Sequence, residues 1–104
     1  MRVTAYAALA EPSRRRILDQ LLDRPRTVGD LVAALNVSQP SVSKHLRVLR
    51  DAGVVEARKD AQRRVYELRP EALAEVLAWV EPYRRLWSGR LDALEQHLDS
   101  KERR

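Results

Sequence analysis

The sequence predicts a mainly α-helical fold in which four helices, two β-strands and a last helix follow one another (α-α-α-α-β-β-α). Apolar residues recur at helical spacing over most of the 104 residues, and two β-like stretches lie between residues 54 and 68. Pro12, Gly53 and Pro70 stand where a helix is expected to begin or end. Because a chain of this length fits one hydrophobic core, we expect residues 1–104 to form a single domain.

Charge is unevenly distributed along the chain. The net charge is +5; residues 1–70 carry 14 Lys and Arg against 8 Asp and Glu, whereas residues 71–104 carry 6 against 7. The basic excess therefore lies in the first two-thirds of the chain, as expected for a region that meets a polyanion such as nucleic acid.

The composition also excludes several classes of protein. Cysteine is absent, which excludes disulfides and thiolate metal sites. Two distant histidines and the lack of a glycine-rich phosphate loop leave no catalytic constellation, so we expect neither an enzyme nor a cofactor or metal. No apolar run approaches the roughly 18 residues of a membrane span, and the first ten residues lack the layout of a signal peptide. We expect no membrane partner and a cytoplasmic location.

Two short helices are expected at the start of the chain. Residues 3–10 are Ala-rich and apolar, which favours a two-turn helix lying on a neighbouring element. A second helix is expected from Pro12 to about Asp23, and its apolar stripe consists of Ile17, Leu18, Leu21 and Leu22. The first turn of this helix contains Arg14–Arg16, where the helix dipole disfavours cations. We therefore expect at least one of these arginines to have another role.

Residues 27–53 predict a helix, a turn and a second helix. Thr27 is a good N-cap for a helix over residues 28–35, and Asn36 can adopt the left-handed conformation that ends it. Ser38 is then placed to cap the next helix, from Gln39 to Ala52.

The helix over residues 39–52 has two different faces. Val42, Leu46 and Leu49 form a narrow apolar stripe. The opposite face carries Pro40, Ser43, Lys44, Arg47 and Asp51, with Gln39 and Arg50 on its flank. A helix that enters the major groove of DNA needs such an apolar back and polar front. Its serines are expected to let the backbone approach the groove, Gln39 to pair with adenine, and its cations to reach phosphates or guanine. The candidate DNA-binding residues of this helix and its cap are Ser38, Gln39, Pro40, Ser41, Ser43, Lys44, His45, Arg47 and Arg50.

A basic hairpin is expected after this helix. It consists of two β-like stretches, Val54–Arg58 and Arg63–Leu68, joined by residues 59–62, which lack the glycine usual at a hairpin tip. The cations expected to clamp the flanking DNA backbone or the minor groove are Arg58, Lys59, Arg63 and Arg64. A charged hairpin that is merely solvated is the alternative.

The last part of the chain is expected to be helical as well. A helix is predicted from Glu71 to Val80, and Pro82 predicts a break or kink around residues 79–82. Beyond it, apolar residues recur at the helical period of about 3.6 residues. Aromatic residues at such spacing more often pack in a core or a dimer than form a ligand pocket.

Three stretches of the chain resemble a known family. Residues 38–55 (SQPSVSKHLRVLRDAGVV), residues 11–18 (EPSRRRIL) and a tail with Trp79, Trp87 and residues 90–94 are similar to ArsR-type (ArsR/SmtB) bacterial regulators, among the members without cysteine metal sites. The resemblance implies a winged helix-turn-helix repressor that binds a palindromic operator in double-stranded DNA as a homodimer. Its two reading helices would lie one DNA turn apart, about 34 Å. A winged-helix module that binds RNA or protein is the alternative.

The same resemblance implies that different segments of the chain bind DNA and form the dimer. The helix-turn-helix (27–53) and the hairpin, or wing (54–68), would bind DNA, and the helices in residues 1–10 and 70–99 would form the dimer interface. The candidate interface residues are Val3, Tyr6, Leu9, Val80, Tyr83, Trp87, Leu91, Leu94 and Leu98.

Two departures from the family bear on metal sensing. Metal-sensing members carry a cysteine pair on the helix that corresponds to residues 27–35, where this chain has none. Other members place Asp and His ligands along the final helix, where this chain offers only His97 with Asp92 and Asp99. Metal sensing is therefore not expected, and the sequence leaves any small-molecule effector unknown.

Overall fold

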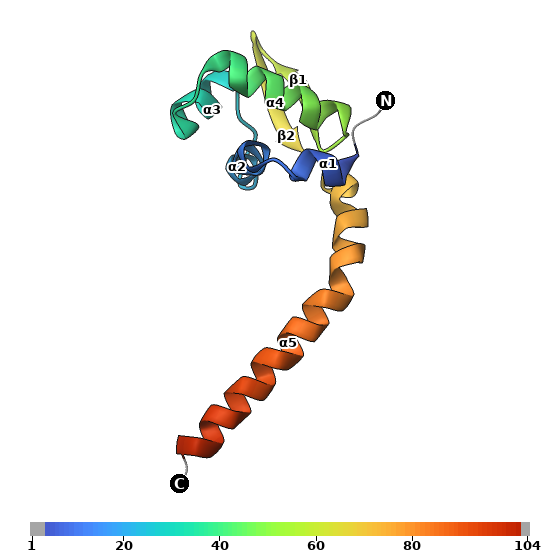
Figure 1. Cartoon of the computed structure of the whole chain (residues 1–104). Helices are drawn as coiled ribbons and strands as arrows, with labels where there is room; N and C mark the ends of the chain where they lie inside the picture. The colour runs from blue at the N-terminus through green and yellow to red at the C-terminus, as the bar shows by residue number, and fades with distance from the viewer. Residues whose placement is uncertain (1–3, 103–104) are drawn as a thin grey trace. The chain divides into compact units, whose positions relative to one another are not determined.

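The computed structural model describes residues 4–102, which divide into two compact units, one ending at Ala74 and the other beginning at Glu75 (Figure 1). The first unit contains α1 (Ala5–Leu9), α2 (Pro12–Leu21), α3 (Val28–Leu35), α4 (Gln39–Asp51), β1 (Val55–Asp60), β2 (Arg63–Leu68) and the 3-10 turn η1 (Pro70–Leu73). The second unit consists of α5 (Ala74–Glu102) from Glu75 onward. The expected mainly helical, winged helix-turn-helix order is confirmed.

No helix in this described part of the chain has both the length and the apolar character that crossing a membrane requires. Val3, a candidate interface residue, lies outside the described residues.

Local hydrogen bonds fix the ends of α3 and α4 where the sequence predicts them. The backbone N–H of Asp30 donates to the Thr27 hydroxyl, and the Thr27 N–H donates to the Asp30 carboxylate, each at 3.1 Å. At the start of α4, the Ser41 N–H donates to the Ser38 hydroxyl at 3.3 Å. Asn36, with φ of 54°, ends α3 in the left-handed conformation that such positions favour.

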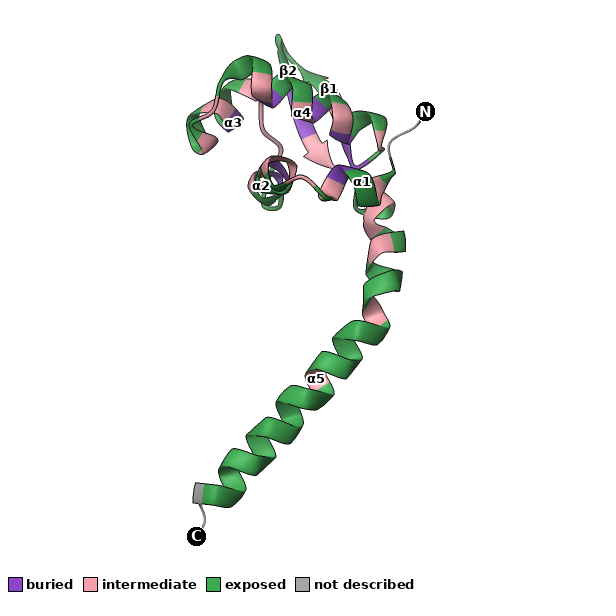
Figure 2. Cartoon of the chain, in the orientation of Figure 1, coloured by how far each residue is buried: buried purple, intermediate pink, exposed green. Residues whose placement is uncertain are grey.

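The core of the first unit lies where α2, α3, α4 and β1 meet (Figure 2). The predicted stripe of α4, Val42, Leu46 and Leu49, is at most 1% exposed. Ile17 of α2 and Leu31 of α3 are equally buried. Because burying one such side chain stabilises a fold by about 1.5–3 kcal/mol, this stripe fixes which face of α4 points outward.

A backbone bridge joins the wing to the connection between α2 and α3. The Arg26 N–H donates to the Tyr66 carbonyl at 2.9 Å, and the Tyr66 N–H donates to the Arg26 carbonyl at 2.8 Å. The outer strand of the hairpin therefore has a partner at one point on its second edge, which holds the base of the wing to the helices.

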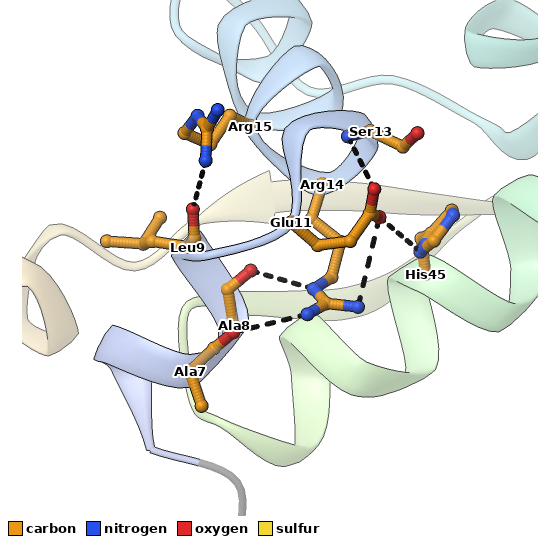
Figure 3. A network of polar contacts seen from close by, with 8 residues as sticks. All are labelled: Ala7, Ala8, Leu9, Glu11, Ser13, Arg14, Arg15 and His45. Atoms are coloured by element: carbon orange, nitrogen blue, oxygen red, sulfur yellow. Dashed lines mark hydrogen bonds and ion pairs between the residues drawn. The ribbon is translucent and has the colours of Figure 1, made fainter.

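The arginines at the start of α2 cap the end of α1 (Figure 3). Arg14 donates from Nε to the Ala8 carbonyl at 2.7 Å and from Nη2 to the Ala7 carbonyl at 3.1 Å. Arg15 donates from Nη1 to the Leu9 carbonyl at 2.8 Å. A helix has its negative end at its last carbonyls, so cations are favourable there. The expectation that at least one of these arginines has another role is confirmed.

Several expected boundaries in the first unit are wrong by one or two residues. The first helix begins at Ala5 and α2 ends at Leu21, so Leu22, expected in its apolar stripe, lies past the last turn and is 77% exposed. The strand β1 extends to Asp60, which pairs with Arg63, and therefore the loop shrinks to two residues.

The end of the chain differs from the expectation in one respect. The 3-10 turn η1 replaces the start of a helix at Glu71, and α5 then begins at Ala74 (Figure 1). Of the break or kink expected at Pro82, the break does not occur, because α5 continues through this residue. Proline removes one backbone donor and crowds the preceding turn, but the hydrogen bonds of the other turns of this 29-residue helix keep it continuous.

The hairpin tip generates a stability prediction. Its two-residue loop has a positive φ at the first residue, Ala61 (57°), where such a turn favours glycine. An alanine in this conformation is disfavoured by about 1 kcal/mol, so we expect Ala61→Gly to raise the free energy of unfolding by up to about that amount. Thermal and urea unfolding measure the change. The control, Ala34→Gly on the exposed face of α3, should lower stability by about 1 kcal/mol; a loss of stability in both variants would contradict the turn geometry.

Candidate nucleic-acid interface

The outward face of α4 is exposed along its length. Six of its exposed side chains are hereafter called the reading face: Pro40, Ser43, Lys44 and Arg47 lie opposite the buried stripe, and Gln39 and Arg50 lie on the flank. The exposed Asp51 lies on the same side at the last residue of the helix. The sequence predicts that each of the six reading-face residues contacts DNA, and the structure brings them together on one surface of one helix. Cationic, amide and hydroxyl groups in this arrangement match what base edges and phosphates accept from a helix in the major groove.

The two remaining serines support the helix start. The Ser38 hydroxyl is the N-cap acceptor of α4, and Ser41 is half-buried. The Ser38 hydroxyl accepts from the Ser41 N–H, the Ser38 carbonyl accepts from the Val42 N–H, and Pro40 has no N–H. Of the first turn, this leaves the Gln39 N–H at the positive end of the helix dipole. The expected contact of the two serines with DNA stays a prediction.

His45 lies on the flank of the buried stripe and not on the reading face, and its expected contact with DNA stays a prediction. The exposed fraction of its side chain is 19%, and its Nδ1 lies 3.4 Å from Oε2 of Glu11 at the start of α2 (Figure 3). The imidazole sits beside Leu46 and Leu49 in the helical sequence, on the flank of the buried stripe, and therefore turns toward the protein.

A groove of about 340 Å³ separates the reading face from the wing. Its lining includes Ser43, Arg47 and Arg50 from α4 and Arg64 from β2. Three guanidinium groups on two elements thus border one hollow, which suits an anion because arginine can bind phosphate oxygens in bidentate fashion. The sequence predicted each arginine but not their convergence, because the pairing of β2 with β1 decides where Arg64 lies.

The wing cations differ in their surroundings. Arg58 pairs with Glu67 on the neighbouring strand at 3.4 Å, which offsets its charge. Lys59 lies directly opposite Arg64 in the register, and both are exposed. Like charges across a strand pair are destabilising, and a polyanion bound there would relieve this repulsion. Exposed Arg63, next to the tip, completes the expected set.

The start of α3, the helix that packs behind α4, is held by a capping box. The backbone N–H of Thr27, followed by the Thr27 hydroxyl, lowers the pKa of the Asp30 carboxyl below its ordinary 3.8. An ionised Asp30 is the better acceptor for the Thr27 N–H and is favourable at a helix N-terminus. This box sets the start of α3, which packs Leu31 against α4.

The candidate interface residues of α5 form an unusually apolar exposed surface. Val80, Tyr83, Trp87, Leu91, Leu94 and Leu98 are 37–63% exposed. The rings of Trp79 and Tyr83 lie 5.0 Å apart between centroids. Tyr6 of α1 is 39% exposed and Leu9 is half-buried. Apolar side chains at helical spacing on an exposed helix are typical of a surface that another chain covers.

Within the described residues, no three His, Asp or Glu side chains gather as a metal site would require. His97, Asp92 and Asp99 are spread along exposed turns of α5.

Comparisons with known proteins point to one family. The family model described as bacterial regulatory protein, arsR family, matches residues 11–57. The HTH-type transcriptional regulator Rv2034 of Mycobacterium tuberculosis is 41% identical over 92% of this chain and 87% of its own length. The transcriptional repressor SdpR of Bacillus subtilis is 35% identical over 72% of this chain and 83% of its own.

A solved structure agrees with these relatives. It is the homodimeric winged helix-turn-helix DNA-binding domain of a possible ArsR-family regulator from Mycobacterium bovis. It aligns with a TM-score of 0.62 and 32% identity, and covers 75% of this chain and 72% of its own.

The lowered pKa of Asp30 generates a prediction for acid stability. A carboxyl with a depressed pKa stabilises the fold fully above its unfolded value, and this contribution is lost as pH falls through the folded value. We expect Asp30→Asn to be less stable than the wild type at neutral pH, and the difference to shrink below about pH 4. Urea unfolding across this pH range measures it. Asp19→Asn, at an exposed position in α2, is the control; a difference for Asp30→Asn that is independent of pH would contradict the capping role.

Proposed function

The chain belongs to the arsR family of bacterial regulatory proteins, and from this premise we propose that it is a homodimeric repressor that binds a palindromic DNA operator. The observation that carries the proposal is the reading face of α4, because a helix with a buried apolar back presents an uncovered row of amide, hydroxyl and cationic groups. Members of this family are transcriptional regulators and not enzymes.

In the proposed complex, α4 lies in the major groove. Gln39, at the first turn, can pair with an adenine edge, and Arg47 or Lys44 can reach guanine or phosphate. Short Ser43 allows the backbone to come close to the groove. The groove lined by Arg47, Arg50 and Arg64 supports a phosphate bound between the reading face and the wing.

The wing would hold the flanking DNA. Lys59, Arg63 and Arg64 are exposed around its tip, and contacts from such cations to the backbone or the minor groove raise affinity at any sequence. Arg58 contributes less in this proposal, because Glu67 already neutralises it.

Two copies would associate through α1 and α5, so that residues 1–10 and 70–99 serve dimerisation within a single domain of residues 1–104. The apolar face of α5 supports this proposal, because an exposed surface of this kind is stabilised when a second copy covers it. Two-fold symmetry would then present two reading helices about 34 Å apart to a palindrome.

Repression would follow from occlusion of the promoter by the bound dimer. Because the proposed target is bacterial DNA, the protein would act in the cytoplasm. No effector is part of the proposal.

Selection of bound sequences from random duplex DNA by the purified protein tests this function. The expected result is a palindromic consensus whose half-sites are about one helical turn apart. Enrichment of no sequence, together with stronger and sequence-dependent binding to structured RNA, would overturn the proposal in favour of an RNA-binding module.

The reading face generates a prediction for DNA affinity. We expect Arg47→Ala and Lys44→Ala each to weaken binding to the selected operator severalfold while circular dichroism shows an intact fold, because both side chains are exposed and leave the core untouched. Arg85→Ala, which removes the same charge from exposed α5, is the matched control. Unchanged affinity in both reading-face variants would mean that another surface binds DNA.

The apolar face of α5 generates a prediction for association. Trp87 is 63% exposed in the single chain, and we expect Trp87→Ala to weaken the dimer by about 3–5 kcal/mol if its ring is fully buried there. Sedimentation equilibrium measures the dimer dissociation constant. Gln96→Ala, half a turn away around the helix, should leave it unchanged. Equal constants for wild type and Trp87→Ala would place the interface elsewhere.

A further inference from the structure

Two polar atoms that face each other between α2 and α4 are shielded from solvent. They are Oε2 of Glu11 and Nδ1 of His45, which lie 3.4 Å apart, and within the described residues neither atom has a hydrogen-bond partner (Figure 3). A buried polar atom without a partner is costly, so the two atoms are expected to satisfy each other.

The surroundings of Glu11 decide which atom carries the proton. Oε1 of Glu11 accepts from the Ser13 N–H at 3.1 Å, and Arg14 Nη1 lies 4.0 Å from Oε2. The Ser13 N–H lowers the pKa of Glu11, and His45 and Arg14 lower it further against the effect of burial. At neutral pH the carboxylate therefore has only acceptors to offer, and the donor must be Nδ1–H of the imidazole.

We infer that Glu11 and His45 form a positioning pair that holds the reading helix against the start of α2, with the proton of the pair on His45 Nδ1. The pair lies in a continuous set of contacts, because Arg14 reaches both Glu11 and the carbonyls of Ala7 and Ala8 in α1. The orientation of α4 is thereby tied to the corner between α1 and α2.

This positioning role goes beyond the proposed function. It rests on that function only in so far as α4 is called the reading helix, because the proposal places α4 in the major groove. His45 acts here through Glu11 and the helix, and not through a contact of its own with DNA. Free histidine in water prefers the other neutral tautomer, with the proton on Nε2, so the pair has a spectroscopic signature that a merely packed imidazole would lack.

The first test reads the tautomer in the free protein, without DNA. The chain contains two histidines, and His97 on exposed α5 is the internal reference. Nitrogen-15 correlation spectra of the rings, recorded at a pH where they are neutral, should show Nδ1–H for His45 and mainly Nε2–H for His97. In Glu11→Gln, which keeps an acceptor for Ser13 and can donate to Nδ1, His45 should shift toward Nε2–H. An Nε2–H ring at His45 in the wild type would overturn the pair.

The second test uses two substitutions that place a donor differently. His45→Asn puts its amide N–H close to the position of Nδ1, whereas His45→Gln puts it near that of Nε2. We expect His45→Asn to bind the selected operator within about twofold of the wild type and His45→Gln to lose about tenfold, the size of one lost buried hydrogen bond. Hydrogen exchange of the α4 amides should be slower in the Asn variant than in the Gln variant.

These readouts separate the pair from the proposed function. Failure to select any operator would refute DNA binding, yet the tautomer and hydrogen exchange would still decide whether the pair exists. Equal affinity and equal exchange in the Asn and Gln variants would overturn the positioning role.

Discussion

The burial of one stripe of α4 is the constraint on which the rest of the structure depends. Val42, Leu46 and Leu49 have almost no exposed surface, and α2, α3 and β1 supply what they contact. A helix that buries this stripe has only one face left for solvent, and this face is the reading face. A polar substitution in the stripe would therefore disturb the site as well as the stability, because the same packing sets both.

Around this stripe, short-range interactions hold each helix in its place. The Thr27–Asp30 capping box begins α3, the Ser38 hydroxyl begins α4, and Arg14 caps the end of α1. Each interaction is weak by itself, but together they fix where the helices begin and end. The positions from which cations can reach DNA follow from these helix ends.

The elements were predictable from the sequence where local chemistry decides them. Thr27, Asn36 and Ser38 act within one helical turn of themselves, so the ends of α3 and α4 follow from residue type and spacing. Contacts between distant residues were not predictable in this way. The approach of Glu11 to His45 and of Arg64 to Arg50 depends on how helices and strands pack, and the course of α5 through Pro82 depends on the many other hydrogen bonds of that helix.

Methylation interference on the selected operator tests most directly whether the reading face of α4 contacts base edges in the major groove. Methylation of guanine N7 blocks that groove, whereas methylation of adenine N3 blocks the minor groove. If α4 lies in the major groove, N7 methylation should abolish binding in two clusters about 10 base pairs apart, with minor-groove effects confined to the flanks. Interference from the minor groove alone, or none at any base, would contradict this placement.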